Sequence, residues 1–189
     1  MSVGVAASAW EQRKLGELAD SFSYGLNASA TAYDGKNGYL RITDIDDSTR
    51  QFSKNDLTSP DADLSRCGDY RLSEGDIVFA RTGASVGKTY IYQAKDGIAY
   101  FAGFLIRMRL KPDIDPCFVF QSTLGETYKR YVSITSQRSG QPGVNAEEYA
   151  ECPVLMPLLT EQQAIGRFFS RLDSLITLHQ RKQYLPFVR

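Results

Sequence analysis

Histidine and cysteine are scarce in this sequence of 189 residues, which contains one histidine and three cysteines. Cys67, Cys117 and Cys152 are widely spaced, and no Cys-x-x-Cys pair occurs. A zinc site needs clustered thiolates or imidazoles, so we expect no metal centre and three reduced thiols that behave as small apolar side chains. Because His179 is the only imidazole, a Ser-His-Asp or Cys-His group is hard to build. The sequence therefore predicts no catalytic residues.

Long apolar runs are also missing, since no stretch approaches the roughly 20 apolar residues that a bilayer crossing requires. The segment Met1–Ala9 is small and apolar but carries no basic residue, which argues against a signal peptide. We therefore expect a cytoplasmic protein that makes no membrane contact. Hydrophobic residues make up 42% of the chain and charged residues 23%, which is typical of one folded domain with a short appendage.

The chain has no excess of charge of either sign, with 22 basic and 22 acidic residues. A protein that binds nucleic acid is usually basic, because it neutralises phosphates. Two explanations reconcile a neutral chain with such a partner: one face of the protein is basic, or another subunit supplies most phosphate contacts. The first is supported only in part, by basic residues in the middle of the chain: Arg107, Arg109, Lys111, Lys129, Arg130 and Arg138.

Short apolar runs separated by turn residues predict a core that is mostly β. The clearest feature is a hairpin, with a buried strand at Ile77–Ala80, a glycine-containing turn at Thr82–Gly87 and a returning strand at Thr89–Tyr92. Arg107 and Arg109 alternate at the end of another apolar run, so they should lie on one face of a strand. The remaining segments around this core are a strand at Tyr39–Ile45, a loop at Asp46–Pro60, the apolar run Ile98–Leu110 and a short strand at Val154–Leu159 interrupted by Pro157.

Two helices are expected in the second half of the chain. The first spans Asp115–Tyr131, with Asp115 as N-cap and Pro116 at the first helical position. The second follows Thr160, which is spaced from Gln163 as in a capping box. Its apolar residues recur at steps of three and four and form one stripe: Ile165, Phe168, Phe169, Leu172, Leu175, Ile176 and His179. This stripe must be buried, either against its own domain or, as its terminal position and coiled-coil spacing favour, against a partner helix.

Two motifs resemble catalytic sequences without matching them. A phosphate-binding loop requires G-x-x-x-x-G-K-[ST], but Thr82 occupies the position of the first glycine, and the β-type run after Lys88 predicts a strand in place of the required helix. The letters Asp115-Pro-Cys-Phe118 differ from the D-P-P-[YF] motif of adenine methyltransferases at Cys117. The start of a helix explains the same letters. Neither motif therefore supports an enzyme.

Several segments in order resemble one family, the DNA specificity subunits of Type I restriction-modification systems. The similarity extends from about Trp10 to Lys182. It is carried by Trp10–Leu18 (WEQRKLGEL), Tyr39–Ile45 (YLRITDI), Gly75–Lys88 (GDIVFARTGASVGK), Gly140–Asn145 (GQPGVN) and Pro153–Ile165 with its LTEQQ core.

The resemblance implies a mixed α/β fold. A target recognition domain with a mostly β core and flanking helices would span residues 1–158, and a coiled-coil-like helix at 159–189 would set spacing and dock partners. Such subunits recognise double-stranded DNA and bind methyltransferase (modification) and restriction subunits. Catalysis, S-adenosylmethionine and ATP would belong to those partners, so this chain would need no cofactor. Complete subunits usually hold two recognition domains and this chain holds one, so we expect a homodimer through the terminal helices.

DNA reading requires side chains that bond to base edges, such as Arg with guanine and Asn or Gln with adenine. The candidates lie in the hairpin turn, in the glycine-rich segment and in N-terminal loops: Arg81, Thr82, Ser85, Lys88, Gln137, Arg138, Gln141, Asn145, Tyr24, Asn27 and Arg41. For the hairpin turn and for Gly140–Gly143, a purely structural turn remains the alternative. For the whole chain, the alternative is a protein-interaction adaptor that uses the terminal helix without binding DNA.

Overall fold

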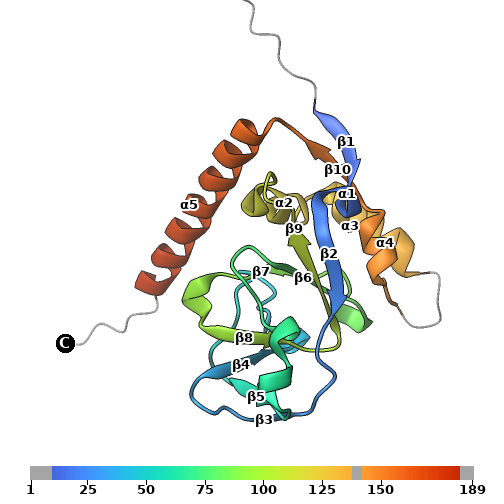
Figure 1. The fold of residues 1–189 in the computed structure, drawn as a ribbon. Helices are drawn as coiled ribbons and strands as arrows, with labels where there is room; N and C mark the ends of the chain where they lie inside the picture. Colours follow the sequence, from blue (N-terminus) through green and yellow to red (C-terminus); the bar gives the residue numbers. More distant parts are fainter. Residues whose placement is uncertain (1–9, 138–141, 184–189) are drawn as a thin grey trace, which may run out of the picture.

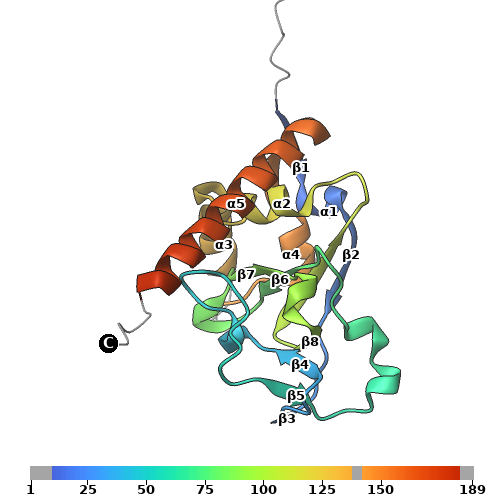
Figure 2. The same ribbon diagram turned by 90° about the vertical axis from the view of Figure 1, so that its left-hand side faces the viewer.

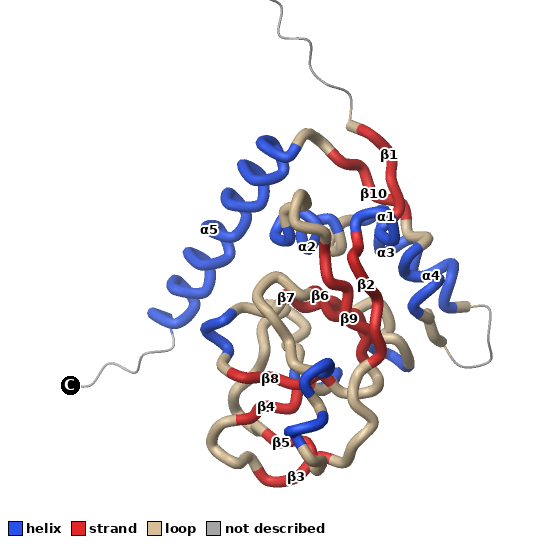
Figure 3. Tube along the Cα trace, in the orientation of Figure 1, coloured by secondary structure: helices blue, strands red, loops and turns tan. Residues whose placement is uncertain are grey.

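The computed structural model of the chain describes residues 10–137 and 142–183. At its centre lies a four-stranded antiparallel sheet in the order β2-β9-β6-β7. Its strands are β2 (Ala19–Tyr24), β9 (Leu105–Leu110), β6 (Ile77–Ala80) and β7 (Thr89–Ile91). Helices lie on one side of this sheet and a group of shorter strands on the other (Figures 1 and 3). The predicted mixed α/β fold with a C-terminal helix is therefore confirmed.

The middle strand β6 is covered on both faces. All four of its side chains are 0% exposed. Because side chains alternate along a strand, Ile77 and Phe79 pack with the helices, while Val78 and Ala80 pack with the shorter strands. Burial on both faces explains why this strand has a continuous apolar sequence and no alternation with polar residues.

The helical layer consists of α1 (Leu15–Leu18), α2 (Pro116–Ser122), α3 (Glu126–Ser136) and α4 (Ala146–Ala150). The Asp115 carboxylate accepts a hydrogen bond from the Phe118 amide at 2.8 Å, so the predicted cap of α2 is confirmed. The prediction of one helix over Asp115–Tyr131 is wrong, because α2 ends at Ser122 and α3 begins at Glu126. The buried Thr123 hydroxyl donates to the Phe120 carbonyl oxygen and also bonds to the Thr89 hydroxyl of β7. The backbone of Gly125 is extended and not helical, so the helix is interrupted between Ser122 and Glu126.

The layer of shorter strands pairs β4 (Asn37–Leu40) with β8 (Ile98–Phe101) in parallel, and β3 (Ala30–Ala32) with β5 (Thr58–Pro60) antiparallel. Three expectations are corrected here. The strand predicted at Tyr39–Ile45 stops at Leu40, the loop expected at Asp46–Pro60 contains β5, and the run Ile98–Leu110 is split into β8 and β9. Short 3-10 turns lie in the connections between the strands of both sheets: Ile42–Asp44, Leu64–Arg66, Gly68–Tyr70, Gly83–Ser85 and Ala94–Asp96.

The break between β8 and β9 lies at Ala102–Phe104, where the chain passes from one sheet to the other. The Leu105 amide donates to the Ala102 carbonyl oxygen at 2.8 Å, and the Leu26 amide donates to the Phe101 oxygen at 2.8 Å. Gly25 lies so close to this turn that a Cβ atom there would clash with the Ala102 carbonyl. An apolar run that looks continuous in the sequence therefore serves two sheets.

The first and last strands meet at one edge of the body. β1 (Glu11–Lys14) pairs antiparallel with β10 (Pro153–Met156), with Glu11 opposite Met156. β10 ends at Met156, immediately before Pro157, so the strand predicted over Val154–Leu159 is too long, and Leu159 instead begins the last helix. The Trp10 indole NH also donates to Glu161 at 3.2 Å, which joins the N-terminal segment to the start of the last helix.

The last helix, α5 (Leu159–Gln183), lies along the outside of the body (Figures 1 and 2). The predicted capping box is wrong, because the helix begins one residue before Thr160 and the Leu158 carbonyl accepts from the amides of Glu161 and Gln162 at 2.9 Å each. Gln162, and not Gln163, is the buried glutamine. It accepts from the Asp115 amide and donates to the Pro157 carbonyl, and so ties α5 to α2.

Further contacts with α2 hold the N-terminal half of α5. A Cβ atom at Gly166 would clash with the Asp115 carboxylate, so only glycine permits this approach of the two helices. About two helical turns later, Gln121 donates to Asp173 at 3.0 Å. Within the described residues, no helix is long and apolar enough to cross a membrane.

Candidate nucleic-acid interface

The hairpin turn and the start of the segment before α4 lie against each other. The Gly83 amide donates to the Pro142 carbonyl at 3.0 Å, and the Val144 amide donates to the Arg81 carbonyl at 2.9 Å. Thr82 and Gly143 form an antiparallel bridge between these two contacts. Two segments about sixty residues apart, both proposed from the sequence as DNA-reading elements, therefore form one continuous surface.

Tyr24, at the end of β2, joins the same surface. The Arg81 guanidinium lies 5.2 Å above the Tyr24 ring, and the Tyr24 hydroxyl accepts from the Ala146 amide at 3.3 Å. The Tyr24 side chain is still 45% exposed. We call the cluster formed by Tyr24, Arg81, Thr82 and Pro142–Asn145 the hairpin edge. It gathers three of the regions from which the candidates were chosen.

Two buried tyrosines hold the hairpin in place. The Gly87 amide donates to the Tyr149 hydroxyl at 3.0 Å, and the Tyr128 hydroxyl donates to the Gly87 carbonyl at 3.0 Å. Tyr149 also donates to the Ala80 carbonyl at 2.7 Å. Burial raises the pKa of both phenols, so both remain protonated at neutral pH. These hydrogen bonds fix the position of the hairpin edge relative to α3 and α4.

Three of the candidate side chains are engaged within the fold. Lys88 is only 8% exposed and bonds to Asp47 at 2.6 Å and to the Ile45 carbonyl, so its ammonium group is already paired within the fold. Arg41 forms a bidentate salt bridge with the Asp44 carboxylate, with distances of 2.8 and 2.9 Å. Asn145 caps α4, accepting from the Glu148 amide at 2.8 Å, and this occupies its side-chain oxygen.

The other candidates differ in position. Ser85 is half-buried in the 3-10 turn of the hairpin, and Gln137 is exposed at the C-cap of α3. Asn27 is exposed just after β2. Arg138 and Gln141 lie outside the described residues. Of the original set, Arg81, Thr82, Tyr24 and Asn145 are those that the structure brings together at the hairpin edge, with the Asn145 side chain used as a helix cap.

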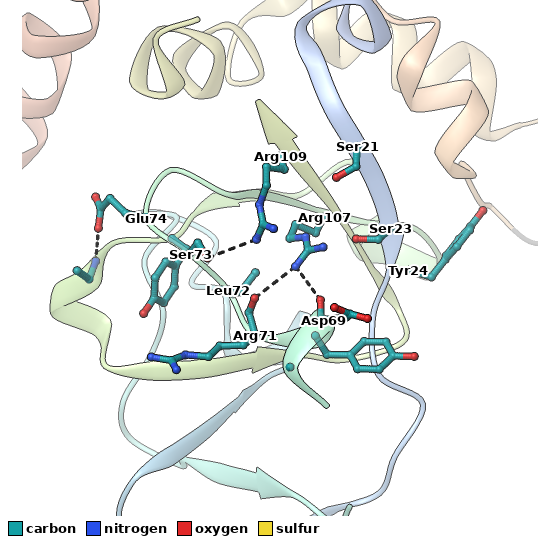
Figure 4. A pocket seen from close by; sticks show the side chains of 14 residues that line it. Ser21, Ser23, Tyr24, Asp69, Arg71, Leu72, Ser73, Glu74, Arg107 and Arg109 are labelled. Atoms are coloured by element: carbon teal, nitrogen blue, oxygen red, sulfur yellow. Dashed lines mark hydrogen bonds between the residues drawn. The ribbon is translucent and has the colours of Figure 1, made fainter. Parts of the chain in front are cut away.

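A cavity of about 780 Å³ beside the hairpin edge was not predicted from the sequence (Figure 4). The expectation that Arg107 and Arg109 share one strand face is confirmed, since both line this cavity. They lie opposite Ser23 and Ser21 of β2 in the strand register. The alternation of arginines was visible in the sequence, but their pairing with serines depends on which strand lies next to β9.

The two arginines of this cavity differ in their partners. Arg109 bonds to the buried Asp76 carboxylate at 2.9 and 2.8 Å, which raises the pKa of Arg109. Arg107 donates to the carbonyls of Asp69 and Arg71 at 2.8 and 3.3 Å. Burial and the neighbouring Arg109 lower the pKa of Arg107 below its usual value, although the group stays charged at neutral pH.

The apolar stripe of α5 is divided between two environments. Ile165 packs against the helical core, and the rest of the stripe is exposed. The exposed fractions are 63% for Phe168, 38% for Phe169, 39% for Leu172, 64% for Leu175 and 47% for Ile176, and His179 is exposed as well. Only the beginning of the stripe therefore packs on its own domain, and the remainder forms an uncovered apolar face.

Among the described residues, no group of three or more His, Cys, Asp or Glu side chains could hold a metal ion. The three cysteines are free thiols, with Cys67 and Cys152 buried and Cys117 half-buried. Burial raises the pKa of Cys152 to about 12, so at neutral pH it is a protonated, unreactive side chain.

The chain is similar in sequence to one curated protein and in fold to several solved structures. Over 180 residues the chain is 27% identical to the putative type I restriction enzyme MjaX specificity subunit of Methanocaldococcus jannaschii, an alignment that covers 92% of this chain and 42% of the relative. The HsdS subunit of Thermoanaerobacter tengcongensis matches 98% of this chain and 43% of its own length, with a TM-score of 0.60 and 14% identity.

Two further solved structures share the fold. The S subunit of the type I restriction-modification system of M. genitalium matches with a TM-score of 0.62 and 16% identity, over 98% of this chain and 45% of its own length. A chain from a structure of type I R-M system assembly and conformational transition matches with a TM-score of 0.64 and 14% identity, over 93% of this chain and 41% of its own length. This chain thus spans less than half the length of these relatives.

The family model described as Type I restriction modification DNA specificity domain matches residues 7–184, nearly the whole chain. The protein therefore belongs to the Type I restriction-modification DNA specificity domain family.

Proposed function

We propose that this chain reads one half of a split DNA target as the specificity component of a Type I restriction-modification complex. The observation that carries the proposal is the hairpin edge, in which Tyr24, Arg81 and Thr82 meet the Pro142–Asn145 segment. Hydrogen bonds from two buried tyrosines hold this hairpin in place. Rigid positioning favours specificity, because a side chain already placed for a base edge loses little conformational entropy on binding.

The neutral net charge is consistent with this role if a partner supplies most phosphate contacts. Several cations of the chain are already neutralised within the fold, as in the pairs Lys88–Asp47, Arg41–Asp44 and Arg109–Asp76. Pairing of this kind reduces the positive charge that the chain can offer to the phosphate backbone, and methyltransferase and restriction subunits would provide further positive surface. S-adenosylmethionine and ATP would bind to those subunits, with no catalysis by this chain.

The uncovered face of α5 is the surface proposed for assembly. Because the chain spans 42% of its M. jannaschii relative, two copies joined through α5 would provide the two recognition units of a longer subunit. A two-fold dimer of this kind would read two half-sites related by the same symmetry. The same helices would dock the modification subunit.

The decisive experiment is co-purification of the chain with its modification subunit, followed by mapping of methylated adenines in DNA exposed to the complex. We expect methylation at one split sequence. An assembly that methylates no defined sequence, or a chain that binds no modification subunit, would contradict the proposal. In the second case, an adaptor role for α5 without DNA would replace it.

Arg81→Ala tests the hairpin edge directly. We expect it to reduce discrimination between the target duplex and a duplex changed at one base pair by about 1–3 kcal/mol, the value of a good arginine–guanine contact. Fluorescence anisotropy with both duplexes measures the difference. Arg130→Ala removes the same side chain from an exposed position on α3 and should change nothing. Equal discrimination by Arg81→Ala and the parent chain would exclude Arg81 as a base-reading residue.

A further inference from the structure

Of the residues that form the hairpin edge, the cavity lined by Arg107 and Arg109 contains only Tyr24. Its walls come from β2, from β9 and from the segment Gly68–Glu74, and Tyr24 lies at its margin (Figure 4). Tyr24 also belongs to the hairpin edge. The cavity is therefore continuous with the surface proposed to face DNA, and a duplex lying on the hairpin edge would bring its backbone to this opening.

Arg107 is unusual among the arginines whose surroundings the structure describes, because it is buried without an ion pair. It is 6% exposed, and within the described part of the chain no carboxylate lies within ion-pair distance of its guanidinium. Backbone carbonyls hold one of its nitrogens, and the Phe101 ring lies 5.1 Å from the guanidinium carbon. A buried positive charge of this kind favours an anion that completes its coordination.

Two buried polar atoms of residues that line this cavity have no hydrogen-bond partner among the described residues. They are Nε of Arg107 and the hydroxyl oxygen of Ser23, which lies opposite Arg107 in the strand register. Buried polar groups are normally paired, so an unpaired guanidinium nitrogen beside an unpaired hydroxyl is a specific combination. Guanidinium and hydroxyl donors together are the usual ligands of phosphate oxygens in protein–DNA complexes.

The remaining lining residues determine which anion fits. Arg71 is exposed at the opening and forms no ion pair in the described structure, so a second guanidinium is available there. Two acids also line the cavity: the Glu74 carboxylate accepts from the Ala94 amide, and Asp69 is exposed. Asp69 adds some repulsion, which disfavours a doubly charged ligand and favours the single charge of a phosphodiester.

We propose, on the basis of the DNA-reading function above, that this cavity binds one phosphodiester of the DNA backbone beside the bases read by the hairpin edge. Arg107 and Ser23 form the floor of the site and Arg71 its rim. Because the Arg107 guanidinium is fixed by two carbonyls, it cannot extend to a base edge. The site therefore sets the position of the duplex and carries no sequence information of its own.

The test uses Arg71→Ala in the full chain, assembled with the modification subunit, because Arg71 is exposed and its loss should leave folding intact. Arg66→Ala is the matched control, since Arg66 is exposed five residues earlier and does not line the cavity. The probes are a duplex selected from a random library and an unrelated duplex, each titrated over a range of salt concentrations. Ser23→Ala, a small change at the floor, provides a second variant.

We expect Arg71→Ala to weaken binding of both duplexes by a similar factor, about tenfold for one charged hydrogen bond. The slope of log K against log salt should become shallower by about 0.9, the value for one phosphate. Phosphate ethylation should interfere at one position with the parent chain and no longer with Arg71→Ala. Ser23→Ala should weaken both duplexes in the same direction.

Three results would overturn the site. Unchanged affinity and salt slope in Arg71→Ala would exclude a phosphate at the rim, while a loss confined to the selected duplex would show that Arg71 reads a base. A parent assembly that binds no duplex would remove the proposed function together with this site. Normal discrimination by the hairpin edge with an unaffected Arg71→Ala variant would remove only the site.

Discussion

Gly87→Ala is expected to lower the free energy of unfolding by about 2–5 kcal/mol, the sum of two effects. Gly87 has φ of +82°, and an alanine in this left-handed region costs about 1–2 kcal/mol. In addition, a Cβ atom would lie 2.6 Å from a methyl group of Val132, a stiff β-branched side chain on α3 that is 7% exposed. Relief of such overpacking typically costs about 1–3 kcal/mol.

Gly83→Ala separates the two effects. Gly83 has a similar φ of +72°, but a Cβ atom there would have no neighbour within 4 Å. Denaturant titration should therefore give a loss of only about 1–2 kcal/mol for Gly83→Ala. The double variant Gly87→Ala with Val132→Ala should lose less stability than the sum of the two single losses, because the smaller side chain at position 132 removes the clash. Equal losses for Gly83→Ala and Gly87→Ala would mean that contact with α3 does not hold the hairpin.

The double change Leu172→Asp with Leu175→Asp is expected to convert the proposed homodimer into monomers and to abolish docking of the modification subunit. Both leucines are on the uncovered face of α5, with 39% and 64% of their surfaces exposed. Buried anchor residues at protein interfaces contribute about 2 kcal/mol or more each, and each leucine occurs twice in a two-fold dimer, so the dimer dissociation constant should rise by a factor of about 100,000 or more. Light scattering and co-purification measure the two effects.

A control with the same change of charge is Arg167→Gln with Arg171→Gln. Both arginines are exposed on α5, and each replacement lowers the charge by one unit, as each Leu→Asp replacement does. The control should remain dimeric. If the leucine variant also stays dimeric, the apolar face of α5 does not join two copies.

Local patterns were sufficient to predict the hairpin, the cap of α2 and the existence of α5. In each case the signal lies within a few residues: an apolar run bounded by turn residues, an aspartate followed by proline, or an apolar stripe at helical spacing. The resemblance of ordered segments to one family also identified the fold class correctly. The capping box failed because Thr160 and Gln163 have the right spacing, while the helix begins one residue earlier, at Leu159.

Other features depend on partners that are distant in the sequence. Lys88 looked like a free cation next to a glycine turn, but its partner Asp47 lies 41 residues earlier in the chain. The turn between α2 and α3 is fixed by a bond from Thr123 to Thr89 on another element. The arginine cavity arises only because β9 lies beside β2. Spacing within one segment contains none of this information.

The antiparallel pairing of β1 with β10 has a consequence for how such proteins diversify. It brings the beginning of the target-reading body, at Glu11, next to its end, at Met156, immediately before α5 starts. Because the two ends of this segment are adjacent, we expect that a homologous segment could replace it with only this one strand pair to match. Under the proposed function, such an exchange would change the surface that reads DNA and leave α5, the surface proposed for assembly, unchanged.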